Sequence, residues 1–495
     1  MSKIIIQNGN MCELDLPLKF AQKLYNEFAI RHPNAFYLRT RQRGMQNWDG
    51  KIHYITKTGQ FKIGLLPKVY DMCIEMGIKP KVVDMRQPLP KVSKVVTNIG
   101  KYELRPEQEK AVKSVINNRV GDTPFHIGVL DYTVNAGKTL IMSSLYLTYK
   151  KQLKTLLITN DSDWLNQARE EFKQYLPGED ITFVQGKVLN WSNFTIGMVQ
   201  SISRNMRFYQ KELSQIDMVL VDEADQGGSK QYQNVITRLF NTRIRIGLSG
   251  TIYMSKLAKD KVKNMNLECF FGKVIAEFKL KDSIKKGYST KTIVKMVPGK
   301  PWYGNWESDC ISYKEIYDDS ITENNTAWTM AYNRLRWNIN QGRYPALVVC
   351  KHIAHCENLY KFFKKKLGDA YNIAYVHVNT PSKLRQQIMR DFREGKIDIL
   401  VSTTIIARGK NFPKLRYLLN AASMDSQEKS IQFLGRLVRT DKSKKKVYLD
   451  DLHYPGPYLD RHGKHRKQYY QRQELKVILL DKLWKKHPNH SLIKS

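Results

Sequence analysis

Short apolar runs alternate with amphipathic stretches from about residue 100 onward, and this alternation constrains the fold more than any other feature of the chain. Such runs, separated by helical patterns, are typical of strands in a parallel sheet that is buried on both faces. The first series is HIGVL (126–130), TLLIT (155–159), FTIGMV (194–199), MVLVD (218–222) and RIRIGLS (243–249). The second is ALVVC (346–350), IAYVHV (373–378), IDILVST (397–403), RYLLNA (416–421) and KKVYLDDL (445–452). We therefore expect two similar α/β units in tandem.

The segment before residue 100 has a different character. Its hairpin-like runs FYLRTRQ, KIHYITKTGQ and FKIGLL precede a helical PKVYDMCIEMG, which predicts a small separate α+β module. The polar stretch after residue 280 is interpreted as a connection, with a loop at PGKPWYGNWESD and a helix at ITENNTAWTMAYNRLRWNIN. ELKVILLDKLWKK is the clearest helix of a basic tail. The expected boundaries are 1–95 for the module, 96–280 and 281–455 for the two units and 456–495 for the helical tail.

The charge of the chain indicates a polyanionic partner. It carries 82 Lys and Arg against 46 Asp and Glu, a net charge of +36, which favours nucleic acid, although an ordinary basic enzyme is the alternative. The six cysteines are scattered without a Cys-x-x-Cys pair, so neither a disulfide framework nor a metal cluster is indicated. No signal-peptide core and no apolar run of about 18 residues occurs, so we expect a cytoplasmic protein without membrane contact.

The turn DYTVNAGKT follows an apolar run and opens a helical pattern, which is the context of a phosphate-binding loop. Tyr132 stands where the usual pattern has a glycine, and Gly-Lys-Thr alone is often only a helix start. In a working loop, the N–H groups of Asn135, Ala136 and Gly137 would face phosphates. Lys138 would neutralise the outer phosphates and the Thr139 hydroxyl would bind Mg²⁺.

Two further patterns supply the partners that such a loop needs. The run MVLVD ends in Asp222-Glu223-Ala224-Asp225, where Asp222 can hold Mg²⁺ and Glu223 can polarise an attacking water. In the second unit, QFLGRLVR places Arg436 and Arg439 one helical turn apart, and from a facing domain they could act as arginine fingers.

The order of these motifs resembles the superfamily 2 helicases, ATP-driven nucleic-acid motors with two RecA-like domains. The resemblance implies an α/β fold of two tandem RecA-like parallel-sheet domains behind a small N-terminal α+β domain, with ATP and Mg²⁺ as cofactors. It also implies roles for residues in other matching motifs. Gln108 in LRPEQEKAV would read adenine, GLSGT (247–251) would couple the sites, Gln200 and Ser201 would contact a strand, and Lys351, His352, Thr403, Arg408 and Gly409 would bind nucleic acid or nucleotide.

The N-terminal module carries an NWDG sequence (47–50) that, with its flanks, is similar to the phage branch-migration helicases within this family. By chemistry alone, RTRQRGMQNW offers Arg39, Arg41, Arg43 and Trp48 for phosphate contact and base stacking. A plain hairpin with a solvated basic face fits as well. In that case the basic tail around Lys464, Arg466 and Lys467 is the next candidate for selecting branched DNA.

We therefore expect an ATP-hydrolysing DNA helicase or translocase that acts on forked or branched DNA in replication, recombination or repair. It would work as a monomer in the cytoplasm, that of the host if phage-encoded, beside other replication or recombination proteins. Three alternatives are an RNA helicase, a DNA-binding protein with a vestigial ATP site, and the motor subunit of a restriction system. The second is disfavoured because Lys138, Asp222, Glu223 and both arginines are all present.

Overall fold

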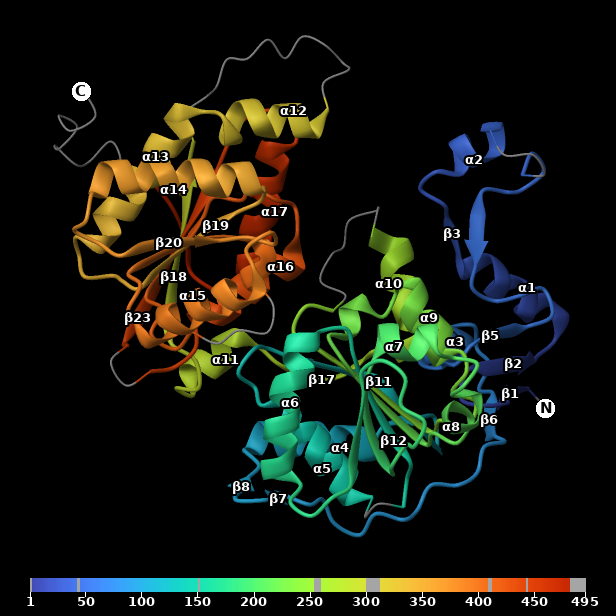
Figure 1. Cartoon of the computed structure of the whole chain (residues 1–495). Helices are drawn as coiled ribbons and strands as arrows, with labels where there is room; N and C mark the ends of the chain where they lie inside the picture. Colours follow the sequence, from blue (N-terminus) through green and yellow to red (C-terminus); the bar gives the residue numbers. More distant parts are fainter. Residues whose placement is uncertain are drawn as a thin grey trace. The chain divides into compact units, whose positions relative to one another are not determined.

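Figure 1 shows a computed structural model of the chain, which divides into two compact units, Met1–Phe278 and Lys279–Ser495. The structure describes residues 2–41, 45–149, 152–252, 260–299, 312–407, 412–441 and 444–480. Among them, no helix combines the length and the apolar character that crossing a membrane requires.

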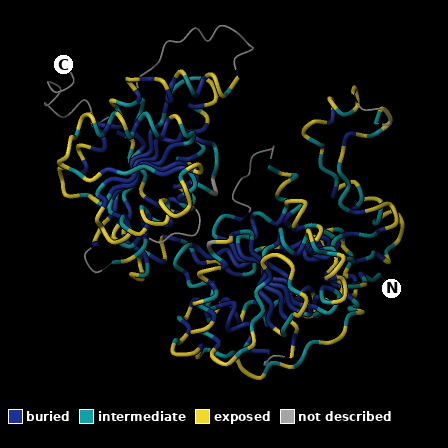
Figure 2. The backbone as a smooth tube through the Cα atoms, viewed as in Figure 1, coloured by how far each residue is buried: buried dark blue, intermediate teal, exposed yellow. Residues whose placement is uncertain are grey.

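The first unit is built on a seven-stranded parallel sheet of order β13-β14-β12-β15-β16-β11-β17. Five of its strands match the first predicted series, and the outermost two were not predicted. Every residue of its central strands is buried, as a sheet covered on both faces requires (Figure 2). The strands are β11 (His126–Tyr132), β12 (Thr155–Thr159), β13 (Ile181–Val184), β14 (Phe194–Met198), β15 (Met218–Asp222), β16 (Ile244–Ser249) and β17 (Val274–Phe278).

The described helices around this sheet pack in pairs, with α4 against α5, α5 against α6, and α7 against α9. They are α4 (Pro106–Ile116), α5 (Lys138–Thr148), α6 (Ser162–Tyr175), α7 (Val199–Arg204), α8 (Gln210–Ser214), α9 (Lys230–Ile236) and α10 (Lys261–Phe271). Because all strands run in parallel, the carboxyl ends of β11, β16 and β15 meet at one edge. That edge is where ligands bind in sheets of this kind.

The N-terminal segment forms a four-stranded sheet of order β5-β2-β1-β6 with two longer helices. The elements are β1 (Lys3–Ile6), β2 (Met11–Asp15), α1 (Leu18–Glu27), β3 (Ala29–Arg31), α2 (Ala35–Arg41), β4 (Lys51–His53), β5 (Gln60–Lys62), α3 (Leu66–Glu75) and β6 (Lys81–Asp84). The hairpin interpretation of FYLRTRQ is wrong, since these residues lie mostly in α2. Ala, Leu and Arg are good helix formers, and the Thr40 hydroxyl donates to the carbonyls of Phe36 and Tyr37 within the helix.

A buried arginine joins the N-terminal sheet to the first parallel sheet. Arg245 of β16 is fully buried, and its guanidinium donates to the Gly9 carbonyl at 2.6 Å and to Asn10 Oδ1 at 2.8 Å. Burial, with the nearby charge of Arg86, lowers the pKa of Arg245 to about 9. At Gly9 an added Cβ would lie 2.5 Å from a carbonyl oxygen, so the two layers meet closely. The N-terminal sheet is therefore part of the same compact unit.

The second unit has another seven-stranded parallel sheet, of order β20-β21-β19-β22-β23-β18-β24. Two parallel sheets of this kind confirm the predicted fold class. The strands are β18 (Lys291–Pro298), β19 (Ala346–Cys350), β20 (Ile373–Val376), β21 (Ile399–Thr403), β22 (Tyr417–Asn420), β23 (Lys446–His453) and β24 (Val477–Leu479). Its helices are α11 (Leu280–Lys285), α12 (Tyr313–Tyr317), α13 (Asn325–Ile339), α14 (Ile353–Leu367), α15 (Ser382–Glu394), α16 (Gln427–Leu437) and α17 (Leu459–Arg472).

Two sequence interpretations in the second unit are wrong. The stretch after residue 280 is more than a connection, because β18 inside it pairs with β23 along eight residues. The helix expected at ELKVILLDKLWKK is absent from its described part, where β24 instead pairs in parallel with β18. A continuous apolar run fits either a buried helix or a strand. Here the run forms a strand because it pairs with the edge of β18 that β23 does not occupy. The described helix of the tail is α17, and residues 481–495 lie outside the described part.

Adjacent aspartates of β23 anchor the helices of the second unit. Arg334 of α13 donates to Asp450 at 2.6 Å, and Arg466 of α17 donates to Asp451 at 2.8 Å. Tyr470 also donates its hydroxyl to Asp451, at 2.8 Å. Arg466 is therefore no part of a basic surface, as the tail hypothesis had it, because its side chain is fully buried in this ion pair.

We expect His355 to make the second unit sensitive to acid. It is fully buried with Nδ1 3.1 Å from the Tyr317 hydroxyl, and burial lowers its pKa from 6.5 to about 3. The unfolded chain binds a proton here below its ordinary pKa whereas the folded chain does not, so stability falls as the pH drops below about 6.5, by roughly 1.4 kcal/mol per unit. Denaturant unfolding of His355→Gln should show a shallower loss between neutral pH and pH ~4.5; an unchanged pH dependence would contradict this assignment.

Candidate functional site

The turn between β11 and α5 has the geometry of an anion-binding loop. Strand β11 ends at Tyr132 and helix α5 begins at Lys138. Asn135 and Gly137 have left-handed φ values of 64° and 71°, with Ala136 between them. Alternation of this kind turns successive backbone N–H groups toward one side, next to the positive end of the helix. The turn opens a helix as expected, with Gly137 as the N-cap residue of α5, and its binding of phosphates stays a prediction.

Tyr132 explains why the motif departs from the usual pattern. It is the last residue of β11, its side chain is buried, and its hydroxyl donates to the Glu107 carbonyl at 2.7 Å. The ring also lies 6.0 Å from that of Phe278. The position therefore belongs to the core below the loop, where an aromatic side chain fits.

Gln108 braces the loop from α4. Its Nε2 donates to the Ala136 carbonyl at 2.8 Å, and its Oε1 accepts from the Arg105 N–H at 2.8 Å. Gly137 is favoured by its left-handed φ, and a Cβ there would also lie 2.2 Å from Gln108 Nε2, so the Gln108 side chain would have to move. Both ends of the Gln108 amide contact the chain itself, and its reading of adenine stays a prediction.

The acidic run lies at the same edge of the sheet. Asp222 ends β15, and its Oδ1 lies 3.8 Å from Lys138 Nζ. Burial raises the pKa of Asp222, against the effect of Lys138, and raises that of Glu223 to about 8 with help from the Asp222 and Asp225 charges. Glu223 has a left-handed φ of 51°. The structure thus gathers several carboxylates around one lysine, an arrangement that favours the arrival of further positive charge.

These donors fit a magnesium–nucleotide ligand. Asp222 Oδ1 is buried and accepts no hydrogen bond among the described residues, so one carboxylate oxygen is available. Thr139 stands in the first turn of α5. Among the described residues no three His, Cys, Asp or Glu side chains are placed to hold a metal by themselves. Mg²⁺ is usually held by one or two carboxylates together with substrate phosphates, so Thr139 and Asp222 would hold it, and it would neutralise phosphate charge.

The GLSGT motif contacts this acidic run. Ser249 at the end of β16 donates its hydroxyl to Asp225 Oδ1 at 2.7 Å. Of the expected strand-contacting pair, Ser201 accepts from the Gly186 N–H at 2.9 Å, while Gln200 Nε2 is 3.4 Å from the Asn160 carbonyl. The contact of Gln200 and Ser201 with nucleic acid stays a prediction.

In the second unit, Lys351 and His352 directly follow β19. Lys351 Nζ lies 3.9 Å from the ring centroid of Tyr313, and burial together with the Lys429 charge lowers the pKa of Lys351. The His352 ring meets that of Tyr317 edge-on, with 4.8 Å between centroids. These two tyrosine rings hold Lys351 and His352 at the end of the strand. The sequence analysis did not identify the two tyrosines, because Tyr313 and Tyr317 precede the strand by many residues.

Of the remaining predicted residues of the second unit, some are placed by the structure and others lie outside the described residues. Arg436 lies in the last turn of α16, but the helix ends at Leu437, so Arg439 does not continue the same helical face as expected. The Arg439 carbonyl accepts from Thr290, 3.2 Å away. Thr403 ends β21. Arg408 and Gly409 lie outside the described residues, as does Arg43 of the N-terminal module.

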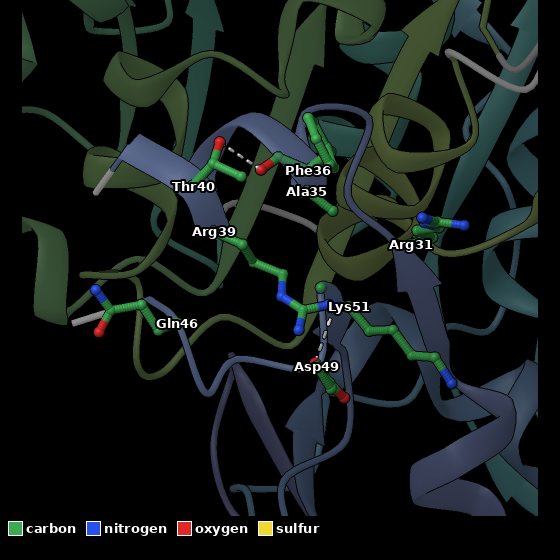
Figure 3. A pocket seen from close by; sticks show the side chains of 9 residues that line it. Arg31, Ala35, Phe36, Arg39, Thr40, Gln46, Asp49 and Lys51 are labelled. Atoms are coloured by element: carbon green, nitrogen blue, oxygen red, sulfur yellow. Dashed lines mark hydrogen bonds between the residues drawn. The ribbon is translucent and has the colours of Figure 1, made fainter. Parts of the chain in front are cut away.

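The N-terminal module presents a basic pocket of about 540 Å³ (Figure 3). Arg39 lines it beside Arg31 and Lys51, two cations that the sequence analysis did not select. Arg41 lies over the Tyr37 ring, 5.0 Å from its centroid. Trp48 donates its Nε1–H to the Lys51 carbonyl at 2.9 Å, so this side chain supports the loop.

Two RecA-like parallel sheets, of which the first carries a phosphate loop opposite paired carboxylates, define a nucleoside-triphosphatase with a tandem core. Residues 101–254 match the family model described as the res subunit of type III restriction enzymes, and residues 331–441 match the helicase conserved C-terminal domain. The chain belongs to the superfamily 2 helicases, which are ATP-hydrolysing enzymes.

Individual relatives agree with this placement. The ATP-dependent DNA helicase UvsW of Enterobacteria phage T4 is 21% identical over 436 residues, covering 82% of each protein. A protein named as a helicase in Sulfolobus islandicus filamentous virus is 23% identical over 71% of this chain, and the chain spans 64% of its length. The DNA-bound type ISP restriction-modification enzyme LlaBIII shares the fold, with a TM-score of 0.58 and 15% identity over 82% of this chain and 34% of its own.

Substitutions at the two sides of the site should differ in kind. Lys138→Ala removes the cation expected to face the phosphates and should weaken nucleotide binding itself. Glu223→Gln should still bind ATP while hydrolysis falls by about 10²- to 10⁴-fold, the usual contribution of a general base. Fluorescent-nucleotide binding and phosphate release measure the two effects, with the exposed Glu103→Gln as a matched control. Near-normal turnover by Glu223→Gln would remove Glu223 from the catalytic role.

Proposed function

We propose that this chain is an ATP-driven DNA helicase or translocase that acts on forked or branched DNA in replication, recombination or repair. The observation that carries the proposal is the approach of Lys138 to Asp222 at the carboxyl edge of a parallel sheet, an arrangement suited to binding a nucleotide. The net charge of +36 adds that the chain is suited to binding a polyanion. The T4 relative is named as a DNA helicase, which supports DNA over RNA.

In this proposal the residues of the first unit carry out the hydrolysis. Lys138 and the N–H groups of the loop bind the phosphates, and Thr139 and Asp222 position Mg²⁺. Glu223 orients the attacking water and takes its proton as the general base. Arg436 and Arg439 act as arginine fingers when ATP brings the second unit to the γ-phosphate, and Gly409 contributes to that nucleotide contact.

Nucleic acid is bound by residues of both units. We assign strand contacts to Gln200 and Ser201 in the first unit and to Lys351, His352 and Thr403 in the second. The N-terminal module contacts a second DNA arm through Arg39 and Arg41, with Arg43 and Trp48 as further candidates. Phosphate contacts of this kind position a duplex without reading its sequence, so we expect DNA structure to matter more than sequence.

An RNA helicase is the second candidate, because a groove that tracks the backbone does not by itself distinguish the sugars. A vestigial ATP site is disfavoured by the intact loop geometry and by the buried, available oxygen of Asp222. For the restriction-motor alternative, the likeness to LlaBIII extends over only 34% of that enzyme.

Nucleic acid should stimulate ATP hydrolysis. We expect single-stranded and forked DNA to raise the steady-state rate well above the basal rate, since the coupling motifs join the nucleotide edge to the strand contacts. Phosphate release is measured side by side with single-stranded DNA, duplex DNA, forked DNA and RNA, with Lys138→Ala as the inactive control. Preferential stimulation by RNA would favour the second candidate, and equal turnover with and without every nucleic acid would contradict a motor.

A further inference from the structure

A slender arm extends from the N-terminal sheet. It consists of residues 29–41 and 45–53, in which β3 and β4 pair antiparallel and carry α2 at their far end (Figure 1). The ribbon is pinned at three registered pairs, from Ala29–His53 to Arg31–Lys51. The underlying N-terminal sheet is in turn held to the first parallel sheet by the Arg245 contact with Gly9.

The end of the arm presents two exposed aromatic side chains, of which Tyr37 has Arg41 over its ring. Phe36 is 79% exposed and Tyr37 is 55% exposed, and Phe36 is the most exposed aromatic side chain among the described residues. Their neighbour Ala35 is buried, and a Cβ on Gly50 would lie 3.1 Å from the Ala35 Cβ, so α2 is held down on this side. The fold thus fixes the helix while leaving Phe36 in solvent, where a large apolar surface is unfavourable unless a partner covers it.

Three basic residues line the pocket to which Phe36 also contributes. Arg31, Arg39 and Lys51 line the same pocket as Phe36, with Asp49 as the acid among the lining residues (Figure 3). Asp49 is already engaged, since it accepts from the Lys51 N–H at 2.9 Å and lies 2.7 Å from His53 Nε2. The surface therefore combines a side chain able to stack on a base with cations able to bind phosphate, which is the chemistry of a nucleic-acid contact.

We propose that this arm is the strand-separating wedge of the enzyme. Phe36, supported by Tyr37, stacks on the last base pair or the first unpaired base at a fork, while Arg31, Arg39 and Lys51 hold the flanking phosphates. Apolar side chains inserted at base steps unstack them at a cost of a few kcal/mol per step, which ATP-driven movement of the attached unit supplies. The inference rests on the proposed function and adds the element that opens the duplex.

The experiment separates duplex opening from ATP use. Strand separation of a forked duplex and ATP hydrolysis with single-stranded DNA are measured for the full chain, for Phe36→Ala and for Phe36→Trp. Loss of one base–aromatic stack is expected to lower strand separation by roughly 10-fold or more, a much larger factor than the change in hydrolysis, and Phe36→Trp should restore it. Phe240→Ala is the matched control, since Phe240 is 46% exposed and is not one of the arm residues.

A second variant tests the charges. Arg31→Ala with Arg39→Ala should make the dependence of log K on log salt shallower for forked DNA, by about 0.9 per lost duplex contact. Equal strand separation by Phe36→Ala and Phe240→Ala, in an enzyme whose hydrolysis DNA stimulates, would overturn the wedge and leave the proposed function intact. Hydrolysis that no nucleic acid stimulates in the parent chain would overturn both.

Discussion

The approach of Lys138 to buried Asp222 is the interaction around which the first unit is organised. Strands β11 and β15 deliver these residues to one edge because the whole sheet is parallel, with β16 between them. Burial makes the carboxylates costly to ionise, and the lysine offsets only part of that cost. A site that holds carboxylates in this state favours the arrival of a cation, which agrees with the proposed binding of Mg²⁺ and phosphates.

Buried ionic contacts also define how the helices and layers are placed elsewhere. In the second unit Asp450 and Asp451 engage arginines of α13 and α17, and in the first unit Arg245 engages the backbone of the N-terminal sheet. Breaking such a contact from one side leaves an uncompensated buried charge, so each contact favours one arrangement of the elements it joins. The arm proposed as a wedge depends on this rigidity, because a wedge that yields at its base would not open a duplex.

Much of the fold and the position of the candidate site could be predicted because they depend on short stretches of sequence. The ten apolar runs are strands in the structure, and α5 begins at Lys138 with Gly137 as its N-cap, as the motif predicts. The failures have physical causes. The sequences of β24 and α2 each fit both a helix and a strand. Pairing with β18 makes the first a strand, and hydrogen bonds within the segment make the second a helix. Arg466 was taken for a surface residue because its partner, Asp451, lies in another element, and the exposure of Phe36 has no signature in the sequence.

The most direct test of the central claim is strand displacement on a forked DNA duplex with ATP and Mg²⁺, compared with ADP and with a non-hydrolysable ATP analogue. The account predicts displacement with ATP alone, at a rate that follows hydrolysis, because opening the fork consumes the free energy released at the Lys138–Asp222 edge. Displacement that is equal with every nucleotide, or hydrolysis of ATP on forked DNA without any displacement or movement, would contradict it.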